Sequence, residues 1–381
     1  MCSHQFSVGG ISKVAHELRD AFIRLGHSVD VLVPLRSLYR KGTISIPCLN
    51  VPGLIGSLSF WECAIRMVKK KRNSYDLIMM HHPVLLDGKF PYLDSNVILT
   101  FHGTYYGYSQ AYNLYKLGHL GPYYDIASQI ESRLLTTLSK VENGNITITG
   151  VSPSTISELQ SNGYSGVAHF IPNALPRIDR IVSKERARSL LKHYAGLHFS
   201  PKDRVLLYVG SIKNVASKRP LLVLSLFRKM ASIDNKMKLV IIGGGYSSHQ
   251  LKSLIRHNKN IFYFESVAAD QLYLFYLGAD AYISLSCYEG LPNSVLEAAA
   301  YGLPLILSNI PAHKWILSSQ IGHGILINSF NPTDDIDIVY SFFASLHDSR
   351  HFPNSDILRR CGWNQIAKEY LMKSTHNALM A

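Results

Sequence analysis

Two glutamates in a small and apolar stretch are the residues of this chain whose type and spacing most suggest chemistry. Glu289 and Glu297 lie in SCYEGLPNSVLEAAAYGLP, residues 286–304, with seven residues between them. Burying a carboxylate costs free energy unless another group pairs with it. Each glutamate should therefore meet either a ligand or a protein partner. Glu289 precedes a turn, and Glu297 is expected in the first turn of the helix that follows.

The start of that helix offers a site for an anion. Free N–H groups and the helix dipole attract negative charge at a helix N-terminus, so a phosphate would fit against the amides of Leu291 to Ser294. A structural alternative stays open for both carboxylates. Ser294 and Glu297 have the spacing of a capping box, and Glu289 could pair with an N–H of the turn.

The elements that must position these residues alternate between strand and helix patterns, which predicts an α/β fold. Strands that alternate with helices form parallel sheets covered by helices on both faces, and ligands bind at the carboxyl ends of such strands. The expected strands lie within 27–34, 75–83, 96–103, 144–153, 167–176, 204–210, 237–245, 260–266, 279–286 and 303–309.

The chain of 381 residues is long enough for two domains. We expect a Rossmann-like N-terminal domain at 1–178, joined by a returning helix at 363–381, and a Rossmann-like C-terminal domain at 179–362. The polar segment 173–203 is the expected linker, and a cleft is expected between the two domains.

Composition argues against several classes of protein. Hydrophobic residues make up 47% of the chain and charged residues 17%, which is typical of a folded protein with sizeable cores. No apolar run has the length of a membrane helix. The five scattered cysteines lack CxxC spacing, which indicates reduced thiols in a cytoplasmic protein and no metal site.

The net charge of +13 should attract an anionic partner. Nucleic acid is the weakest candidate, because no nucleic-acid motif is present, and we expect none to bind. The helical segment 60–72 places apolar residues on one face and ends in four basic residues, so it could lie on anionic lipid at the inner face of the membrane. We favour the alternative of a packed helix with a solvated end.

Segments in order along the chain resemble the retaining glycosyltransferases of the GT-B fold, a family with many bacterial polysaccharide and lipopolysaccharide transferases. Glu289 and Glu297 match its EX7E signature. The resemblance covers nearly the whole chain. The other matching segments are GGISKVAHEL (9–18), TFHG (100–103), VSPSTISEL (151–159), IPNAL (171–175), LYVGSI (207–212), SKRPLLVLSLF (217–227), LVIIGGG (239–245), SNIPAH (308–313) and WNQIAKEYL (363–371).

The resemblance implies catalytic roles for His102, Glu289 and Lys218. Glu289 matches the glutamate that approaches the transferred sugar, and Glu297 matches the one that bonds the donor ribose. Both carboxylates would face hydroxyl groups and need no counter-charge. His102 matches the histidine that touches the donor sugar, with a structural histidine at a strand end as the alternative.

The resemblance also implies positive groups near the diphosphate leaving group, on which charge grows as the glycosidic bond breaks. Family members carry an arginine where this chain has Ser211, and Lys213 or Arg219 is expected to compensate. The alternative for these cations is a solvated loop. The implied donor-binding residues are Gly9, Gly10, Ser211, Lys213, Arg219, Gly290, Leu291, Pro292, Asn293, Ser294 and Glu297.

The implied reaction moves a sugar from a nucleotide-sugar donor to a saccharide or lipid-linked saccharide acceptor with retention of configuration. The donor base (UDP-, GDP- or ADP-linked) stays open, and neither a cofactor nor a metal is implied. Asp335-Ile336-Asp337 forms a DxD, but these residues suit a helix N-terminus. Trp315 stands where relatives often carry an acidic residue.

The stretch before the glycine loop is short for a Rossmann-like domain, which normally begins with a central strand. Only MCSHQFSV precedes Gly9, so we expect the first strand to be missing or reduced to a stub, and the chain to be truncated or to start upstream of Met1. The alternative function is accordingly an inactive or truncated GT-B protein that binds nucleotide without turnover.

Overall fold

The structure is a computed structural model that describes residues 2–3, 10–35, 43–49, 51, 53–71, 75–85, 96–118, 120–140, 145–178, 180–212, 215–245, 248–346 and 350–376. The chain divides into two compact units, Met1–Ala174 with Arg359–Ala381, and Leu175–Leu358. The expected boundaries were 178 and 362. Gly9 and Lys213 lie outside the described residues.

The first unit contains a parallel sheet in the order β3-β2-β1-β4-β5-β6-β7. Its strands are β1 (Cys2–Ser3), β2 (Val31–Pro34), β3 (Thr43–Ile46), β4 (Leu77–His81), β5 (Asn96–Phe101), β6 (Ile146–Gly150) and β7 (Ala168–Phe170). Its helices are α1 (Gly10–Arg24), α2 (Leu54–Lys70), α3 (Tyr105–Leu114), α4 (Gly121–Leu138), α5 (Pro153–Ser161) and α15 (Trp363–His376), with α14 (Ser355–Arg360) at the unit boundary.

The central position of this sheet is occupied by β1. Cys2 pairs with Leu32 of β2 and with Met80 of β4, and Ser3 pairs with His81 of β4. The expectation of a missing first strand is therefore not confirmed, although the strand is only two residues long.

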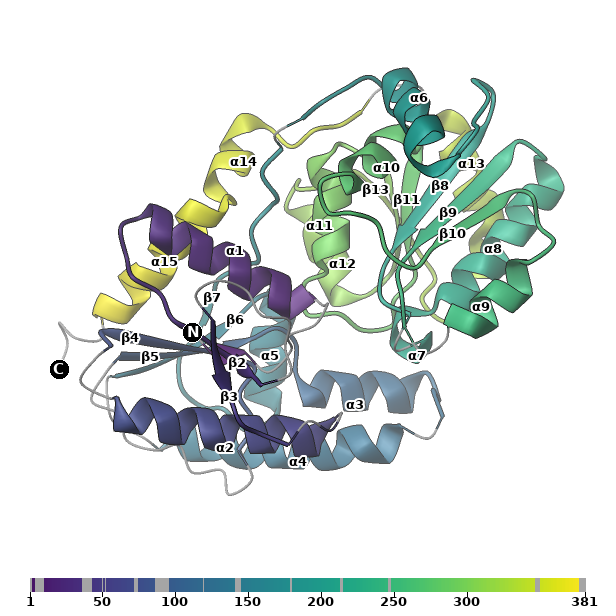
Figure 1. Cartoon of the computed structure of the whole chain (residues 1–381). Helices are drawn as coiled ribbons and strands as arrows, with labels where there is room; N and C mark the ends of the chain where they lie inside the picture. The colour runs from purple at the N-terminus through teal and green to yellow at the C-terminus, as the bar shows by residue number, and fades with distance from the viewer. Residues whose placement is uncertain are drawn as a thin grey trace. The chain divides into compact units, whose positions relative to one another are not determined.

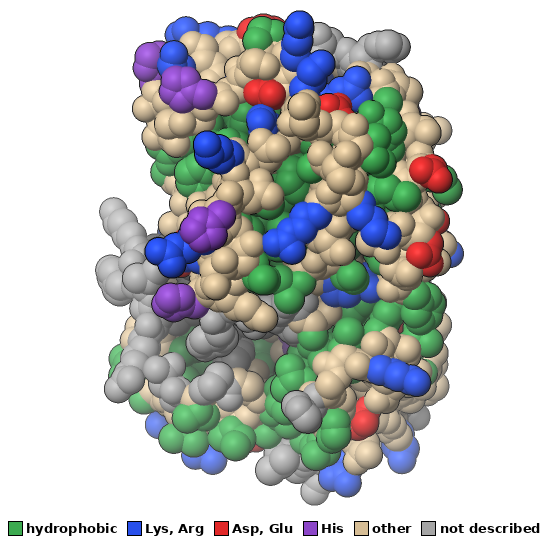
Figure 2. Space-filling view, turned by 90° about the vertical axis from the view of Figure 1, so that its right-hand side faces the viewer, with side chains coloured by type: hydrophobic (Ala, Val, Ile, Leu, Met, Phe, Trp, Pro, Cys, Tyr) green, Lys and Arg blue, Asp and Glu red, His purple; other side chains and the backbone are tan. Residues whose placement is uncertain are grey.

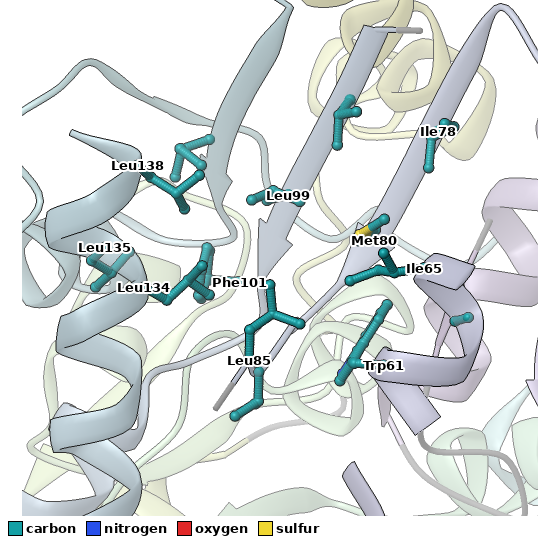
Figure 3. Close-up of a cluster of buried hydrophobic side chains, with 14 of the residues drawn as sticks. Trp61, Ile65, Ile78, Met80, Leu85, Leu99, Phe101, Leu134, Leu135 and Leu138 are labelled. Carbon is teal, nitrogen blue, oxygen red and sulfur yellow. The ribbon is translucent and has the colours of Figure 1, made fainter. Parts of the chain in front are cut away.

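Alternation along the strands sends side chains to two cores in the first unit. Met80 and Leu99 point toward α2 and α4, where they meet the buried Trp61 and Leu134 (Figure 3). Residues one position away, such as Met79, pack on the opposite face against α1 and α15, which lie side by side in Figure 1. The sheet is thus covered on both faces, as predicted for parallel strands.

The helical segment that could have met lipid is instead part of the core. Phe60, Ala64, Ile65 and Val68 of α2 are all buried in the cluster beneath the sheet. The packed-helix alternative is confirmed, and α2 does not offer this face to a membrane. Among the residues that the structure describes, no helix is both long and apolar enough to cross a bilayer.

The second unit repeats the pattern with a parallel sheet in the order β10-β9-β8-β11-β12-β13. Its strands are β8 (Arg204–Val209), β9 (Met237–Ile242), β10 (Ile261–Phe264), β11 (Ala281–Ser284), β12 (Leu305–Ser308) and β13 (Gly324–Ile327). Its helices are α6 (Lys184–Ala195), α7 (Val215–Lys218), α8 (Pro220–Ile233), α9 (Ser248–Ile255), α10 (Leu272–Gly278), α11 (Asn293–Ala300), α12 (Pro311–Ser318), η2 (Pro332–Asp335) and α13 (Ile336–Ser345).

The expected linker at 173–203 is wrong for most of its length, because α6 lies within it. The Ser183 hydroxyl accepts a hydrogen bond from the Arg186 N–H at the start of this helix, and Gly196 ends it in the left-handed conformation. Ala187 and Leu191 are buried, and α6 packs on α10 of the second unit. The segment is therefore a structural part of that unit.

Basic side chains are spread over the face of the molecule that is drawn in Figure 2. On the face drawn in Figure 2, blue Lys and Arg side chains are more frequent than red Asp and Glu side chains, in keeping with the net charge of +13. They are scattered among polar and apolar side chains.

Candidate active site

The two central strands of the second sheet bring Lys218 and Glu289 together. The order of strands reverses between β8 and β11, and such a switch point is where open α/β sheets bind ligands. Lys218, in α7 after β8, pairs through Nζ with Glu289 Oε1, beyond the end of β11. Ser286 Oγ donates a second hydrogen bond to the same oxygen at 2.8 Å. Glu289 thus has a counter-charge in the protein, which corrects the expectation that it needs none.

The second glutamate, Glu297, is buried within α11 and has a hydroxyl partner. Tyr276 of α10 donates its hydroxyl to Glu297 Oε2 at 2.8 Å. Burial and the neighbouring carboxylate raise the pKa of Tyr276 well above its ordinary value, so the phenol keeps its proton. A neutral hydroxyl donor therefore stabilises this carboxylate inside the protein.

The capping-box alternative does not describe this helix. α11 begins at Asn293 after Pro292, which makes no side-chain cap hydrogen bond. Ser294 lies inside the helix and accepts a hydrogen bond from Tyr282 at 2.9 Å. Glu297 is in the second turn rather than the first, because the helix starts two residues earlier than a Ser294 cap would require.

The turn before α11 is largely buried. Gly290, Leu291 and Pro292 are buried, and Glu289, Asn293 and Ser294 are partly exposed. The exposed part of Glu289 therefore lies close in sequence to the amides that begin α11, which are suited to an anion.

Arg219 is a buried structural residue rather than part of a solvated loop. Its guanidinium donates to the carbonyl of Leu285 at 2.5 Å, to the carbonyl of Ser286 at 3.3 Å and to the carbonyl of Ser329. Its backbone adopts the left-handed conformation with φ 47°. Arg219 thus holds the segment that carries Ser286 and leads to Glu289, and its expected role toward the diphosphate stays a prediction.

Ser211, which stands where family members carry an arginine, is exposed after the end of β8. Ser211 follows Gly210, whose carbonyl lies so close to Gly243 at the end of β9 that a Cβ at Gly243 would come within 1.8 Å of it. The absence of a side chain at Gly243 therefore allows the two strand ends to approach one another. Of the expected cations, the structure places Lys218 beside Glu289, while Lys213 is outside the described residues.

In the first unit, the expected site histidine has a partner that sequence reasoning did not assign. His102 Nε2 lies 2.9 Å from His81 Nδ1. Burial and the neighbouring His81 and His82 lower the pKa of His102 well below its ordinary value. The sequence shows two adjacent histidines, His81 and His82, at the end of a strand, but this pattern does not predict that His81 contacts His102. Gly10, the other expected residue of this unit, is exposed and begins α1.

The acidic residues of the DxD lie at a helix start, as predicted. Asp335 is the residue before α13, and its carboxylate accepts a hydrogen bond from the Asn328 N–H. Asp337 lies in the first turn of the same helix. Within the described ranges, no group of three or more His, Cys, Asp or Glu side chains could hold a metal ion.

Comparison with known proteins identifies a family for each half of the chain. Residues 193–344 match the model for "Glycosyl transferases group 1", and residues 8–176 match the model for "Glycosyltransferase Family 4". The crystal structure of WaaG, a glycosyltransferase involved in lipopolysaccharide biosynthesis, has a TM-score of 0.66 at 14% identity, over 97% of this chain and 94% of that one. This similarity shows a shared fold.

Two curated relatives are also similar in sequence. The serotype-specific mannosyltransferase WbdA of Escherichia coli is 28% identical over 156 residues, which are 40% of this chain and 18% of WbdA. The GDP-mannose:cellobiosyl-diphosphopolyprenol alpha-mannosyltransferase of Xanthomonas oryzae pv. oryzae is 24% identical over 240 residues, which are 59% of this chain and 62% of that protein. Both matches cover less than two thirds of the relative. Both models describe glycosyltransferases and together they span most of the chain, so the chain carries a group 1 and a family 4 glycosyltransferase domain in the GT-B fold.

Proposed function

We propose that this protein transfers a sugar from a nucleotide-sugar donor to a saccharide or lipid-linked saccharide acceptor in the synthesis of a bacterial surface polysaccharide, with retention of configuration. The observation that carries the proposal is the Lys218–Glu289 pair at the switch point of the second sheet, next in sequence to the start of α11. It combines a cation and a partly exposed carboxylate with the amides that begin a helix.

These groups match the chemistry of a nucleotide sugar. Lys218 and the first amides of α11 would meet the diphosphate, whose charge grows as the bond to the sugar breaks. Glu297 would accept hydrogen bonds from the ribose hydroxyls, since a carboxylate can accept more than the one bond that Tyr276 donates. Glu289 would face the transferred sugar once Lys218 turns to the phosphate.

Retention follows if the acceptor attacks from the face that the diphosphate leaves. The bond between the anomeric carbon and the phosphate oxygen breaks, and the acceptor oxygen bonds to the same carbon. The acceptor proton passes to the leaving phosphate, so no carboxylate nucleophile is required. Lys218 stabilises the developing charge, and we propose that no metal is needed.

A donor panel tests the proposal. GDP-mannose is the first donor to use, because the names of both curated relatives include a mannosyltransferase activity. Release of nucleoside diphosphate is measured with free and polyprenyl-diphosphate-linked oligosaccharides, with Glu289→Gln as the control, and NMR gives the anomeric configuration of the product. Donor binding without turnover would contradict the transfer, and an inverted product would contradict retention alone.

A further inference from the structure

His81 and His102 lie at the carboxyl ends of two neighbouring strands of the first sheet. His81 is the last residue of β4, and its Cα pairs with that of Thr100 in β5. His102 follows Thr100 by two positions, so the alternation of side chains directs both rings to the same face. This is the face of α1 and α15, because Met79 and Ile98 pack there.

The two rings form a specific contact. His81 Nδ1 and His102 Nε2 are 2.9 Å apart, and the rings stack with centroids 5.2 Å apart. Burial lowers the pKa of His81 to about 3, and the pKa of His102 is also lowered well below its ordinary value. Both rings are therefore neutral near pH 7, and each carries a single N–H.

The surroundings of His81 decide which nitrogen carries its proton. His81 Nε2 is buried and has no hydrogen-bond partner among the described residues. A proton there would leave a buried N–H without an acceptor, which is costly and rare. With the proton on Nδ1, the N–H donates to His102 Nε2 and only a lone pair is left without a partner.

We propose that His81 is a positioning residue, which fixes His102 in the tautomer with its proton on Nδ1. His102 Nε2 then serves as the acceptor for His81, and Nδ1 of His102, a residue at intermediate exposure, carries the N–H that meets its ligand. His102 therefore recognises an acceptor atom, such as an oxygen of the transferred sugar. The identity of that ligand rests on the proposed function, whereas the tautomer does not.

Side-chain ¹⁵N NMR of the full chain without any donor tests the tautomer directly. The signals of His102 are assigned by their loss in His102→Gln. We expect a protonated-type shift at Nδ1 and an unprotonated-type shift at Nε2. The reverse pattern in the wild-type protein overturns the proposal, whatever the activity of the protein is.

Kinetics of two substitutions test the positioning role. His81→Asn places an amide N–H near the position of Nδ1, whereas His81→Leu removes the donor. We expect His81→Leu to lower kcat about tenfold more than His81→Asn, because it removes one hydrogen bond that orients a site residue. We also expect His81→Leu to change the tautomer populations of His102. His169→Leu, in β7 of the same sheet, is the matched control. Equal kcat for both His81 variants contradicts the positioning role, and absence of turnover in the wild type contradicts the proposed function alone.

Discussion

The Tyr276 hydroxyl donates a 2.8 Å hydrogen bond to Glu297, one helix away in the second unit. The Tyr276 ring also stacks on Tyr301, with centroids 5.5 Å apart and planes 10° apart. A buried carboxylate is therefore held by a neutral donor whose own ring is fixed by packing. This arrangement fixes the position of the Glu297 carboxylate through a neutral donor, the Tyr276 hydroxyl.

Tyr276→Phe removes this donor and keeps the ring. Loss of a hydrogen bond to a buried charged group should lower the free energy of unfolding by about 2 kcal/mol. If Glu297 binds the donor ribose, the KM for the donor should rise more than kcat falls. Thermal melting and initial rates measure both, and Tyr340→Phe in α13 is the control. An unchanged melting temperature would contradict the role of Tyr276 in holding Glu297.

Lys218→Met should separate activity from stability. The Lys218 side chain is 29% exposed and the Glu289 side chain 10%, so the ion pair is partly buried. Because Ser286 still donates to Glu289 without Lys218, we expect its loss to lower the free energy of unfolding by only about 1–2 kcal/mol. Removing a cation from a developing phosphate charge should instead lower kcat about 100-fold. The comparison of kcat with melting temperature checks this, and a large loss of stability with normal kcat would show that Lys218 is structural.

Substitution of Arg219, the residue next to Lys218, should have the opposite effect. Arg219→Met should lower the stability of the protein. Arg219 donates to three backbone carbonyls inside the protein, and their loss leaves buried acceptors without donors. We expect the free energy of unfolding to fall by about 3 kcal/mol or more. Denaturant unfolding measures the change, and Arg228→Met, at an exposed arginine of α8, is the control. A stable Arg219→Met protein with a raised donor KM would restore the ligand role that the sequence suggested.

The strands of both sheets could be predicted because apolar runs between turns have a local signature. The three strands that were not predicted have little of it: β1 is two residues long, and β3 and β13 are four residues long and mostly half-buried. The sequence predicts a linker where α6 lies, because the charged residues of this helix outnumber the few apolar ones that it buries. In each case, local composition does not indicate the element, because tertiary packing in the folded unit stabilises it.

The site was predictable as a motif but not as a set of contacts. Glu289 and Glu297 were found from their spacing. Their partners lie 71 residues away at Lys218 and 21 residues away at Tyr276, and the contact between His81 and His102 depends on the register of β4 and β5. Pairing across a sheet or between helices is a property of the tertiary structure, which no local pattern contains.

Gly243→Ala should destabilise the second unit through a direct clash. The new Cβ would lie 1.8 Å from the Gly210 carbonyl oxygen, and Gly243 has a φ of 150°. Because the obstacle is backbone, the strand ends must separate, and we expect a loss of about 3 kcal/mol. Gly196→Ala is the matched control: its φ is 66° and nothing lies within 4 Å of the added carbon, so only about 1 kcal/mol of backbone strain is expected. Equal melting temperatures for the two variants would contradict the clash.

Glu131 should make the first unit less stable as the pH rises. Its buried carboxylate accepts hydrogen bonds from the N–H groups of Tyr105 and Tyr106, which begin the helix after the His102 loop. Burial raises its pKa to about 8, against the lowering effect of these two N–H groups. In the unfolded chain the same group has a pKa near its ordinary value of 4.5. Between these two pH values the folded state binds a proton that the unfolded state does not.

The free energy of unfolding should therefore fall between pH 5 and pH 8, with a slope of at most about 1.4 kcal/mol per pH unit from this group. Glu131→Gln stays neutral and should flatten the curve over that range, while remaining equal to the wild type near pH 5. Urea unfolding at a series of pH values measures both curves. Glu185→Gln, on an exposed site at the start of α6, controls for a change in net charge. Parallel curves for Glu131→Gln and the wild type would mean that Glu131 is ionised in the folded protein, because the N–H groups of α3 then outweigh the cost of burial.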